Sequence, residues 1–221
     1  MSRTPDRFFI RRGLVLGIAA SAAAAPFAVS AATRKRVVTI LGDSITAGLG
    51  LPAAAALPAQ LGLALARLGT PVVVRGAGVS GDTTEDGLGR LNFSVQADTD
   101  VCLVALGGND LLQGLDPKTT KANLAAIVQK LKTRLMGVVL AGMTAPRAVG
   151  AGYARDFSAV FPAVAKAERV LLYPDLLAGV GPGLRQHDGI HPNATGVKII
   201  ATGLAPVVAT ALRERALKLR R

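Results

Sequence analysis

Short apolar runs alternate along this chain with longer segments in which apolar residues recur every three or four positions. Residues 37–41 and 101–106 are almost uniformly apolar, which is typical of strands covered on both faces. The strands expected on this basis are 37–41, 72–74, 101–106, 137–140 and 170–173, and the expected helices are 57–68, 84–91, 117–131, 153–167 and 192–212. This alternation predicts one α/β domain with a parallel sheet between two layers of helices. Pro162 and Pro206 are expected to bend the last two helices.

The first thirty residues have a different pattern, that of an export signal. A basic segment ends in Arg11 and Arg12, an alanine-rich apolar stretch covers 13–29, and small residues follow at 30–32. The paired arginines resemble a twin-arginine signal, although Ile10 stands where Ser or Thr is typical. Ordinary Sec export and an uncleaved N-terminal anchor are the alternatives. We therefore expect residues 1–32 to be an export signal, 33–221 to be a single domain, and the protein to be periplasmic or extracellular.

The chain has a formal net charge of +12, and basic residues gather at 34–36 and 213–221. This pattern indicates solvated helix ends and a tail, or alternatively a surface for weak contact with an anionic membrane. Tryptophan is absent, aromatic residues make up 4% of the chain, and no nucleic-acid-binding motif is present, so no nucleic-acid partner is expected. Cys102 is the single cysteine, lies in an apolar run and is expected to be a buried small residue.

Polar residues suited to acyl-transfer chemistry follow the first three expected strands. Ser44 comes after the first, Gly81 lies in the segment after the second, and Asn109 follows the third. Because ligands bind beyond the carboxyl ends of parallel strands, these residues are expected at one sheet edge. Ser44 is then a candidate nucleophile, and the Gly81 N–H and Asn109 amide are candidate donors to an oxyanion. The alternatives are the N-cap of the next helix for Ser44, a cap of the following turn for Asn109, and a tight-turn glycine for Gly81.

Asp188 and His191 supply a candidate base and its orienting carboxylate. The chain contains only two histidines, His187 and His191, and the Asp-x-x-His spacing lets the carboxylate reach the imidazole Nδ1. The alternative is a surface turn before a helix whose first turn contains Pro192. His187 is expected to be a solvated loop residue. With no further histidine and no cysteine cluster, no zinc site is expected.

Two common motifs are missing, and their absence narrows the class of enzyme. Thr46 replaces the second glycine of a G-x-S-x-G elbow, so the usual α/β-hydrolase arrangement is not indicated. No G-x-G-x-x-G follows a strand, which argues against a dinucleotide cofactor. Asp110 is expected at most to cap a helix. The candidates for an acyl-binding groove, with core packing as the alternative, are Leu111, Leu112 and Leu115.

Four motifs together resemble those of the SGNH/GDSL hydrolase superfamily, and of its bacterial exported arylesterases and lysophospholipase/thioesterases in particular. They are Gly42-Asp43-Ser44-Ile45, Ser80-Gly81-Asp82-Thr83-Thr84, Leu106-Gly107-Gly108-Asn109-Asp110 and Asp188-Gly189-Ile190-His191-Pro192-Asn193. Ile45 stands where that family usually has Leu, a volume-conserving difference. The resemblance implies a three-layer flavodoxin-like sandwich with a five-stranded parallel sheet and no cofactor. It also implies a Ser44–His191–Asp188 triad and an oxyanion hole made by the Ser44 N–H, the Gly81 N–H and the Asn109 side chain.

The expected function is that of a serine esterase that hydrolyses carboxylic esters or thioesters through an acyl-enzyme. Its substrates would be small acyl esters, lysophospholipids among them. A carbohydrate acetylesterase is one alternative, and a non-catalytic envelope binding protein on the same fold is another.

Overall fold

The apolar runs form one parallel sheet in the computed structural model, which describes Met1 and residues 34–219. Its strands are β1 (Val37–Gly42), β2 (Val73–Gly78), β3 (Val101–Ala105), β4 (Gly137–Ala141) and β5 (Leu171–Tyr173). They lie in the order β2-β1-β3-β4-β5, so the direction of winding reverses between β1 and β3. This order is that of flavodoxin-like folds, in which ligands bind at the point of reversal. The predicted fold class is confirmed.

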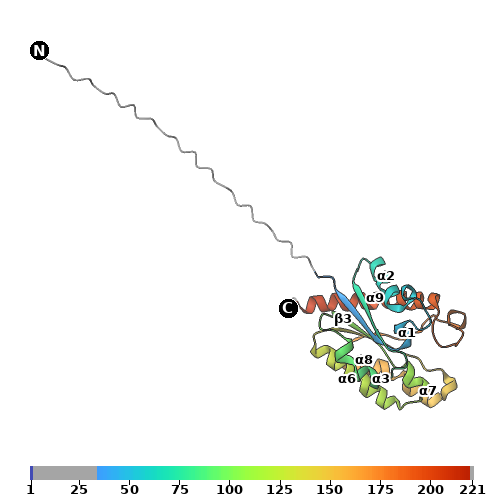
Figure 1. The fold of residues 1–221 in the computed structure, drawn as a ribbon. Coiled ribbons are helices and arrows are strands. Elements are labelled where there is room, and N and C mark those ends of the chain that lie inside the picture. The colour runs from blue at the N-terminus through green and yellow to red at the C-terminus, as the bar shows by residue number, and fades with distance from the viewer. Residues whose placement is uncertain (2–33, 220–221) are drawn as a thin grey trace. The chain divides into compact units, whose positions relative to one another are not determined.

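Helices cover both faces of the sheet (Figure 1). On one face α2 (Leu57–Arg67) packs against α9 (Ala194–Lys218), and on the other α6 (Pro117–Thr133) packs against α3 (Thr84–Gly89) and α8 (Val160–Glu168). The remaining helices are α1 (Ser44–Ala47), α4 (Leu91–Ser94), α5 (Gly108–Leu112), α7 (Ala151–Ser158) and the 3-10 turns η1 (Ala53–Ala55), η2 (Arg147–Val149) and η3 (Pro182–Leu184).

The core lies where the central strands meet the apolar stripes of these helices. Every residue of β1 and β3 is buried, as the uniformly apolar runs predicted. In α2, Leu57, Leu61 and Leu65 are fully buried, at the spacing of one helix face. Each such leucine contributes roughly 1.5–3 kcal/mol through burial of its side chain.

The expected elements and the observed ones differ most where proline or glycine occurs. The expected helix over 153–167 is two helices, α7 and α8, and they meet one turn before Pro162. Proline removes the bond to the carbonyl four residues earlier and its ring crowds that carbonyl, so the break falls after Ser158. Pro206 lies inside α9, which continues as one helix to Lys218. Strand β2 extends past the expected 72–74 to Gly78, because pairing with β1 carries the glycines into the sheet.

By length and composition α9 could cross a membrane, yet 56% of its most apolar window is buried within the protein. It begins at Ala194, two residues after the expected start, because Asn193 caps it by accepting hydrogen bonds from the N–H groups of Thr195 and Gly196. The export signal expected over residues 1–32 lies outside the described residues, Met1 excepted.

Candidate active site

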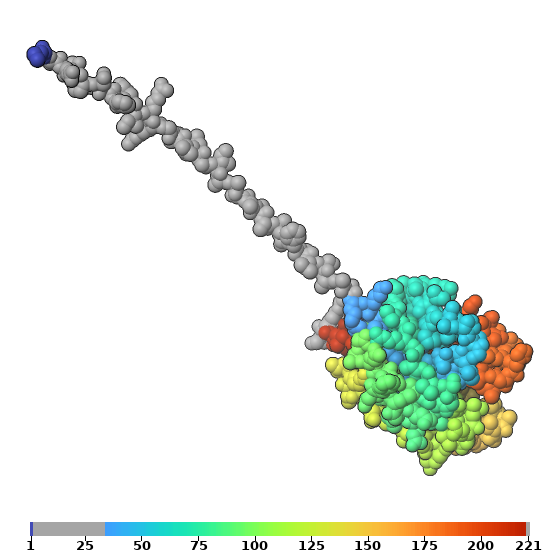
Figure 2. Space-filling view, viewed as in Figure 1, coloured from blue at the N-terminus to red at the C-terminus, as the bar shows by residue number. Residues whose placement is uncertain are grey.

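The first candidate residue, Ser44, lies at the carboxyl end of β1, where the strand order reverses. It is the first residue of α1, only 7% exposed, and its backbone N–H has no acceptor within that helix. Gly78, at the end of β2, lets α1 pack closely, since a Cβ there would lie 2.4 Å from the Ala47 nitrogen. Helix α1 packs against β2. Figure 2 shows the blue-to-turquoise part of the chain, which includes both elements, gathered on one face of the molecule.

Ser44, His191 and Asp188 form a continuous hydrogen-bonded chain. The Ser44 Oγ lies 2.8 Å from His191 Nε2, and His191 Nδ1 lies 2.6 Å from Asp188 Oδ2. The other Asp188 oxygen accepts from the backbone N–H groups of Ile190 and His191. The side-chain bond to His191 and these two N–H groups lower the pKa of Asp188 to about 2. The carboxylate therefore stays ionised above about pH 4.

Gln186 holds the turn that carries His191. Its backbone N–H donates to the His191 carbonyl at 2.8 Å, and its side-chain amide donates to the carbonyls of Leu49 and Pro192. The bond to Leu49 joins this turn to the segment just after α1, across a long stretch of sequence. His187, in the same turn, is exposed, as expected of a solvated loop residue.

The second and third loops place their candidate donors differently. Gly81 has a left-handed φ of +89° in an exposed turn, and within residues 34–219 its N–H donates no hydrogen bond. Asn109 lies in α5, and its Nδ2 donates to the Asp82 carbonyl at 2.8 Å. That bond uses one of the two amide hydrogens of Asn109 and joins α5 to the loop that contains Gly81. A second donor hydrogen remains available on Asn109.

Arg90 ties the same loop to the ends of two strands, a role that the sequence did not reveal. Its Nε donates to Asp82 Oδ2 at 2.5 Å, and its other nitrogens donate to the carbonyls of Ala77 and Gly42 and to the Ser94 hydroxyl. Both members of the Arg90–Asp82 pair are largely buried, with side chains 19% and 11% exposed. An arginine between two short helices gives no signal of this kind in a single sequence.

Asp110 is not a helix cap. Its side chain is buried and accepts hydrogen bonds from the Thr84 N–H at 2.9 Å, the Thr84 hydroxyl at 2.5 Å and the Thr120 hydroxyl at 3.0 Å. The carboxylate thus joins α5 to the starts of α3 and α6. We infer that it stiffens the support of Asn109, its neighbour in the chain.

A cavity of about 390 Å³ opens beside Ser44 and His191. Asn109 lines it together with the apolar side chains of Leu111, Leu112, Met143, Pro146, Leu177 and Ile190. Of the three leucines proposed for an acyl groove, Leu115 is absent from this lining, and its carbonyl accepts from the Tyr153 hydroxyl at 2.9 Å. Gly81 is also outside the lining residues. The size and the apolar walls are those of a small-molecule site.

Asp43 is a buried carboxyl next to Ser44 that the sequence analysis did not single out. Its Oδ1 accepts from the Ile45 N–H at 3.0 Å and so caps α1. Burial raises the pKa of Asp43 to about 6, because the low-dielectric surroundings disfavour its charged form. The only signal for Asp43 in the sequence is its position, since an aspartate between a buried strand and Ser44 is a residue type that caps helices.

Replacing Asp43 by asparagine should remove a pH-dependent loss of stability. Because the folded pKa is raised, the native state binds the proton more strongly than the unfolded chain, and wild-type stability falls as pH rises from about 4 to about 6. The Asp43→Asn variant keeps the cap acceptor without the charge, so its stability relative to wild type should increase over this window by up to ~3 kcal/mol. Urea unfolding at pH 4 and pH 7 measures this difference.

Asp98→Asn is a control whose expected change in stability has the opposite sign. Hydrogen bonds from Arg75 lower the pKa of Asp98, so the wild-type carboxylate stabilises the fold at pH 7 and its loss should destabilise. A stability difference for Asp43→Asn that is the same at both pH values would contradict the assignment of a raised pKa.

Comparisons with known proteins find one matching family and several similar relatives. The GDSL-like Lipase/Acylhydrolase family model matches residues 40–199. The chain is 39% identical over 160 residues to esterase TesA of Pseudomonas aeruginosa, covering 71% of this chain and 80% of that protein. It is 34% identical over 183 residues to an arylesterase of Vibrio mimicus, covering 81% and 92% of the two chains. It is also 38% identical over 169 residues to the Escherichia coli thioesterase 1/protease 1/lysophospholipase L1, covering 75% and 80%.

Solved structures show the same fold. A crystal structure of TesA superposes with a TM-score of 0.75 at 35% identity, covering 80% of this chain and 99% of that one. The SGNH-hydrolase family esterase AlinE4 superposes with a TM-score of 0.68 at 40% identity, covering 81% and 97%. The segment that the family model matches, residues 40–199, contains the loops of Ser44, Gly81 and Asn109 as well as the turn of Asp188 and His191. The chain therefore belongs to the GDSL-like lipase/acylhydrolase family.

Proposed function

We propose that the protein is a serine ester hydrolase that cleaves carboxylic esters and thioesters through an acyl-enzyme on Ser44. The observation that carries this proposal is the Ser44–His191–Asp188 hydrogen-bonded chain at the mouth of an apolar cavity. The named relatives, an esterase, an arylesterase and a thioesterase/lysophospholipase, perform this class of reaction.

The proposed reaction has two steps, acylation of Ser44 and hydrolysis of the acyl-enzyme. Ser44 Oγ attacks the ester carbonyl carbon while His191 Nε2 takes its proton, and Asp188 holds the imidazole in the tautomer that leaves Nε2 free to accept. His191 then protonates the leaving alcohol or thiol, and the acyl group remains on Ser44. In the second step His191 takes a proton from water, the hydroxide attacks the acyl carbon, and Ser44 recovers its hydrogen as the acid departs. The N–H groups of Ser44 and Gly81 and the second amide hydrogen of Asn109 are the proposed donors to the oxyanion.

A fluorophosphonate tests the nucleophile directly. Intact-mass measurement should show one adduct on the wild-type chain and none on Ser44→Ala. Ser80 lies in the loop that contains Gly81, and the control variant Ser80→Ala should carry one adduct. An equal adduct on Ser44→Ala, or none on a folded wild-type protein, would refute the proposed nucleophile.

Removing the Asn109 side chain should slow turnover without abolishing it. Asn109→Ala loses one oxyanion donor, which typically costs about 10²–10³-fold in kcat. Asn123→Ala removes a similar amide, one that instead donates to Thr84, and should change kcat by less than about threefold. Steady-state kinetics with a p-nitrophenyl ester compare the two variants, and equal effects would argue against a role for Asn109 at the oxyanion.

The apolar cavity suggests a substrate with an acyl chain longer than acetyl. Each methylene that enters an apolar site contributes about 0.8 kcal/mol, so octanoate should exceed acetate in kcat/KM by at least about tenfold. Leu112, 62% exposed at the cavity rim, should support this preference, and Leu112→Ser should lower the octanoate-to-acetate ratio. Leu217→Ser, an exposed leucine on α9, is the matched control. Rates for p-nitrophenyl esters from two to sixteen carbons measure the ratio, and a sharp preference for acetate would contradict a lipid-like substrate.

Export and a weak contact with anionic lipid complete the proposal. The leader pattern of residues 1–32, twin-arginine-like, supports delivery to the periplasm or beyond, and the N-terminal mass of the exported protein tests it. Arg34 and Arg215 both pair with Asp100, so the basic segment at 34–36 and the end of α9 adjoin. Such a patch would bind anionic lipid weakly, and vesicle sedimentation at low and high salt measures that binding.

A further inference from the structure

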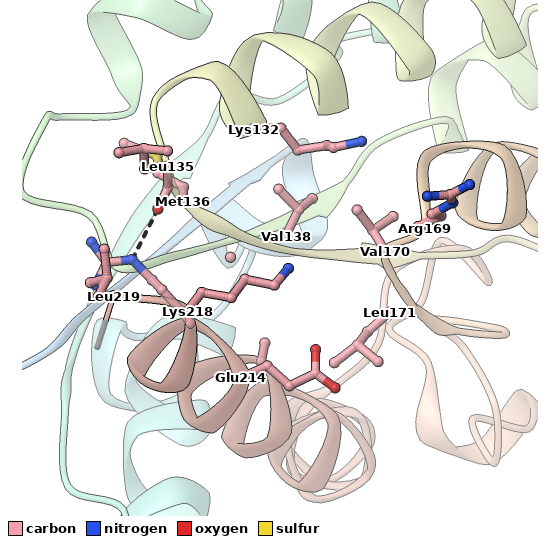
Figure 3. Close-up of a pocket in the computed structure, with 13 residues that line it drawn as sticks. Lys132, Leu135, Met136, Val138, Arg169, Val170, Leu171, Glu214, Lys218 and Leu219 are labelled. Atoms are coloured by element: carbon pink, nitrogen blue, oxygen red, sulfur yellow. Dashed lines mark hydrogen bonds between the residues drawn. The ribbon is translucent and has the colours of Figure 1, made fainter. Parts of the chain in front are cut away.

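A second cavity lies at the opposite edge of the sheet, where the strands begin. Its volume is about 390 Å³, and the C-terminal ends of α6, α8 and α9 surround it together with the first residues of β4 and β5 (Figure 3). No residue is shared between the lining of this cavity and that of the cavity beside Ser44. It is therefore a separate site, which the proposed esterase mechanism does not use.

The walls of this second cavity are largely apolar. Met136, Val138, Val170 and Leu171 form the part nearest the sheet, and Leu135 and Leu219 extend the apolar surface outward. Met136 and Val138 are buried, whereas Leu135 and Leu219 are 70% and 56% exposed. An apolar surface that runs continuously from the interior to solvent is suited to the chain of an amphiphile.

Cations gather around the same cavity. Lys132, Arg169, Arg215 and Lys218 line it with one carboxylate, Glu214. Lys132 and Arg215 are paired with Glu168 and Asp100, but the ion pairs found within residues 34–219 include neither Arg169 nor Lys218. In Figure 3 Lys218 and Glu214 project from α9 on one side of the cavity, and Arg169 lies at the end of α8. Arg169 and Lys218 thus line the cavity without an ion-pair partner among the described residues.

The backbone at this cavity is also unusual. Leu135 and Arg169 are the only non-glycine residues with positive φ in the described part of the chain, at 57° and 55°. Both lie where a helix ends in the left-handed conformation, α6 in one case and α8 in the other, and glycine would adopt it at lower cost. The protein instead carries a large apolar side chain and a guanidinium there, and both line the cavity.

We propose that this cavity binds a single-chain amphiphile with an anionic head, of the class of a medium-chain fatty carboxylate. The carboxylate would lie between Arg169 and Lys218, and the chain would lie along Leu135, Val138 and Leu171. An inorganic anion would leave the apolar wall uncovered, and a neutral lipid would leave both cations without a counter-charge. A carboxylate with an apolar chain is also the product class of the proposed esterase. That connection rests on the proposed function, whereas the binding itself does not.

Decanoate, below its micellar concentration, is the probe for a titration of the ¹⁵N-labelled full chain followed by NMR. Saturable shifts are expected at the amides of Val138, Leu171 and Ala211, and they should persist in Ser44→Ala. Decanol, which lacks the charge, should bind there about tenfold more weakly. Because no turnover is measured, failure of the esterase proposal would leave this result unchanged.

Three variants separate the site from general charge effects. Arg169→Asn/Lys218→Gln should weaken decanoate binding by about tenfold or more, and asparagine tolerates the left-handed conformation at position 169. Glu214→Gln removes the one opposing carboxylate and should strengthen binding several-fold, which a damaged fold could not do. Lys118→Gln/Lys121→Gln removes two exposed charges elsewhere and should have no effect. Shifts confined to the cavity around Leu111, equal binding of decanol, or unchanged binding to the Arg169/Lys218 double variant would overturn the proposal.

Discussion

Replacing Ser44 by alanine is expected to lower kcat by about 10⁴-fold or more while leaving the fold intact. The hydroxyl is the only group at this position that can form the acyl-enzyme, and it lies 2.8 Å from His191 Nε2. The substitution deletes only the hydroxyl from a site that already opens into a cavity, so little packing is lost. Steady-state rates with a p-nitrophenyl ester, together with urea unfolding of the same preparation, separate lost chemistry from lost stability.

The same measurement tests whether Ser44 and His191 act as a unit. Residues that share one proton transfer show strongly non-additive effects, so Ser44→Ala/His191→Ala should be no slower than Ser44→Ala alone. Ser80→Ala is the matched control and should retain nearly full activity. A Ser44→Ala variant that keeps more than about a tenth of wild-type kcat would contradict the proposed mechanism.

The central strands were predictable because strands that are buried on both faces consist almost entirely of apolar residues, as 37–41 and 101–106 do. Strands β1 and β3 match the expected ranges within one residue at their ends. Strand β2 was harder, since its second half, Gly76-Ala77-Gly78, looks like a loop and becomes a strand only by pairing with β1. The local sequence pattern therefore predicted the strands that are buried on both faces. It did not predict the second half of β2, whose conformation depends on pairing with a neighbouring strand.

The candidate site also contains residues that the sequence predicted and residues that it did not. The hydrogen-bonded chain from Ser44 to Asp188 joins residues that were already grouped from the sequence. The position of Ser44 after the first strand and the Asp-x-x-His spacing of Asp188 and His191 were the local signals that grouped them. Arg90, Asp110 and Gln186 went unnoticed as supporting residues, since each acts through contacts to segments distant in sequence. The second amide hydrogen of Asn109 and the Gly81 N–H stay predicted oxyanion donors, and the assigned roles of all these residues remain predictions.

Asp188→Asn is expected to reduce kcat/KM by roughly 10³–10⁴-fold, although the side chain changes by a single heavy atom. The substituted amide could keep accepting from the N–H groups of Ile190 and His191 through its oxygen, which leaves its nitrogen facing His191 Nδ1. An N–H donor there forces the imidazole into the tautomer whose Nε2 carries the proton. Nε2 could then no longer accept the proton of Ser44.

Asp188→Asn is compared with wild type over a pH range in which the wild-type carboxylate does not titrate. The bond to His191 holds the pKa of Asp188 at about 2, so the wild-type carboxylate is ionised throughout the range from pH 4 to pH 9, and its own titration cannot shape the activity profile there. The stabilising contribution of Asp188 is likewise present above its unfolded pKa of 3.8 and is lost only as pH falls toward 2. Rates and urea unfolding should be measured over pH 4–9 beside Asp156→Asn, which removes an exposed carboxylate paired with Arg155. If Asp188→Asn lost less than tenfold in kcat/KM, Asp188, 42% exposed, would serve the turn and not the imidazole.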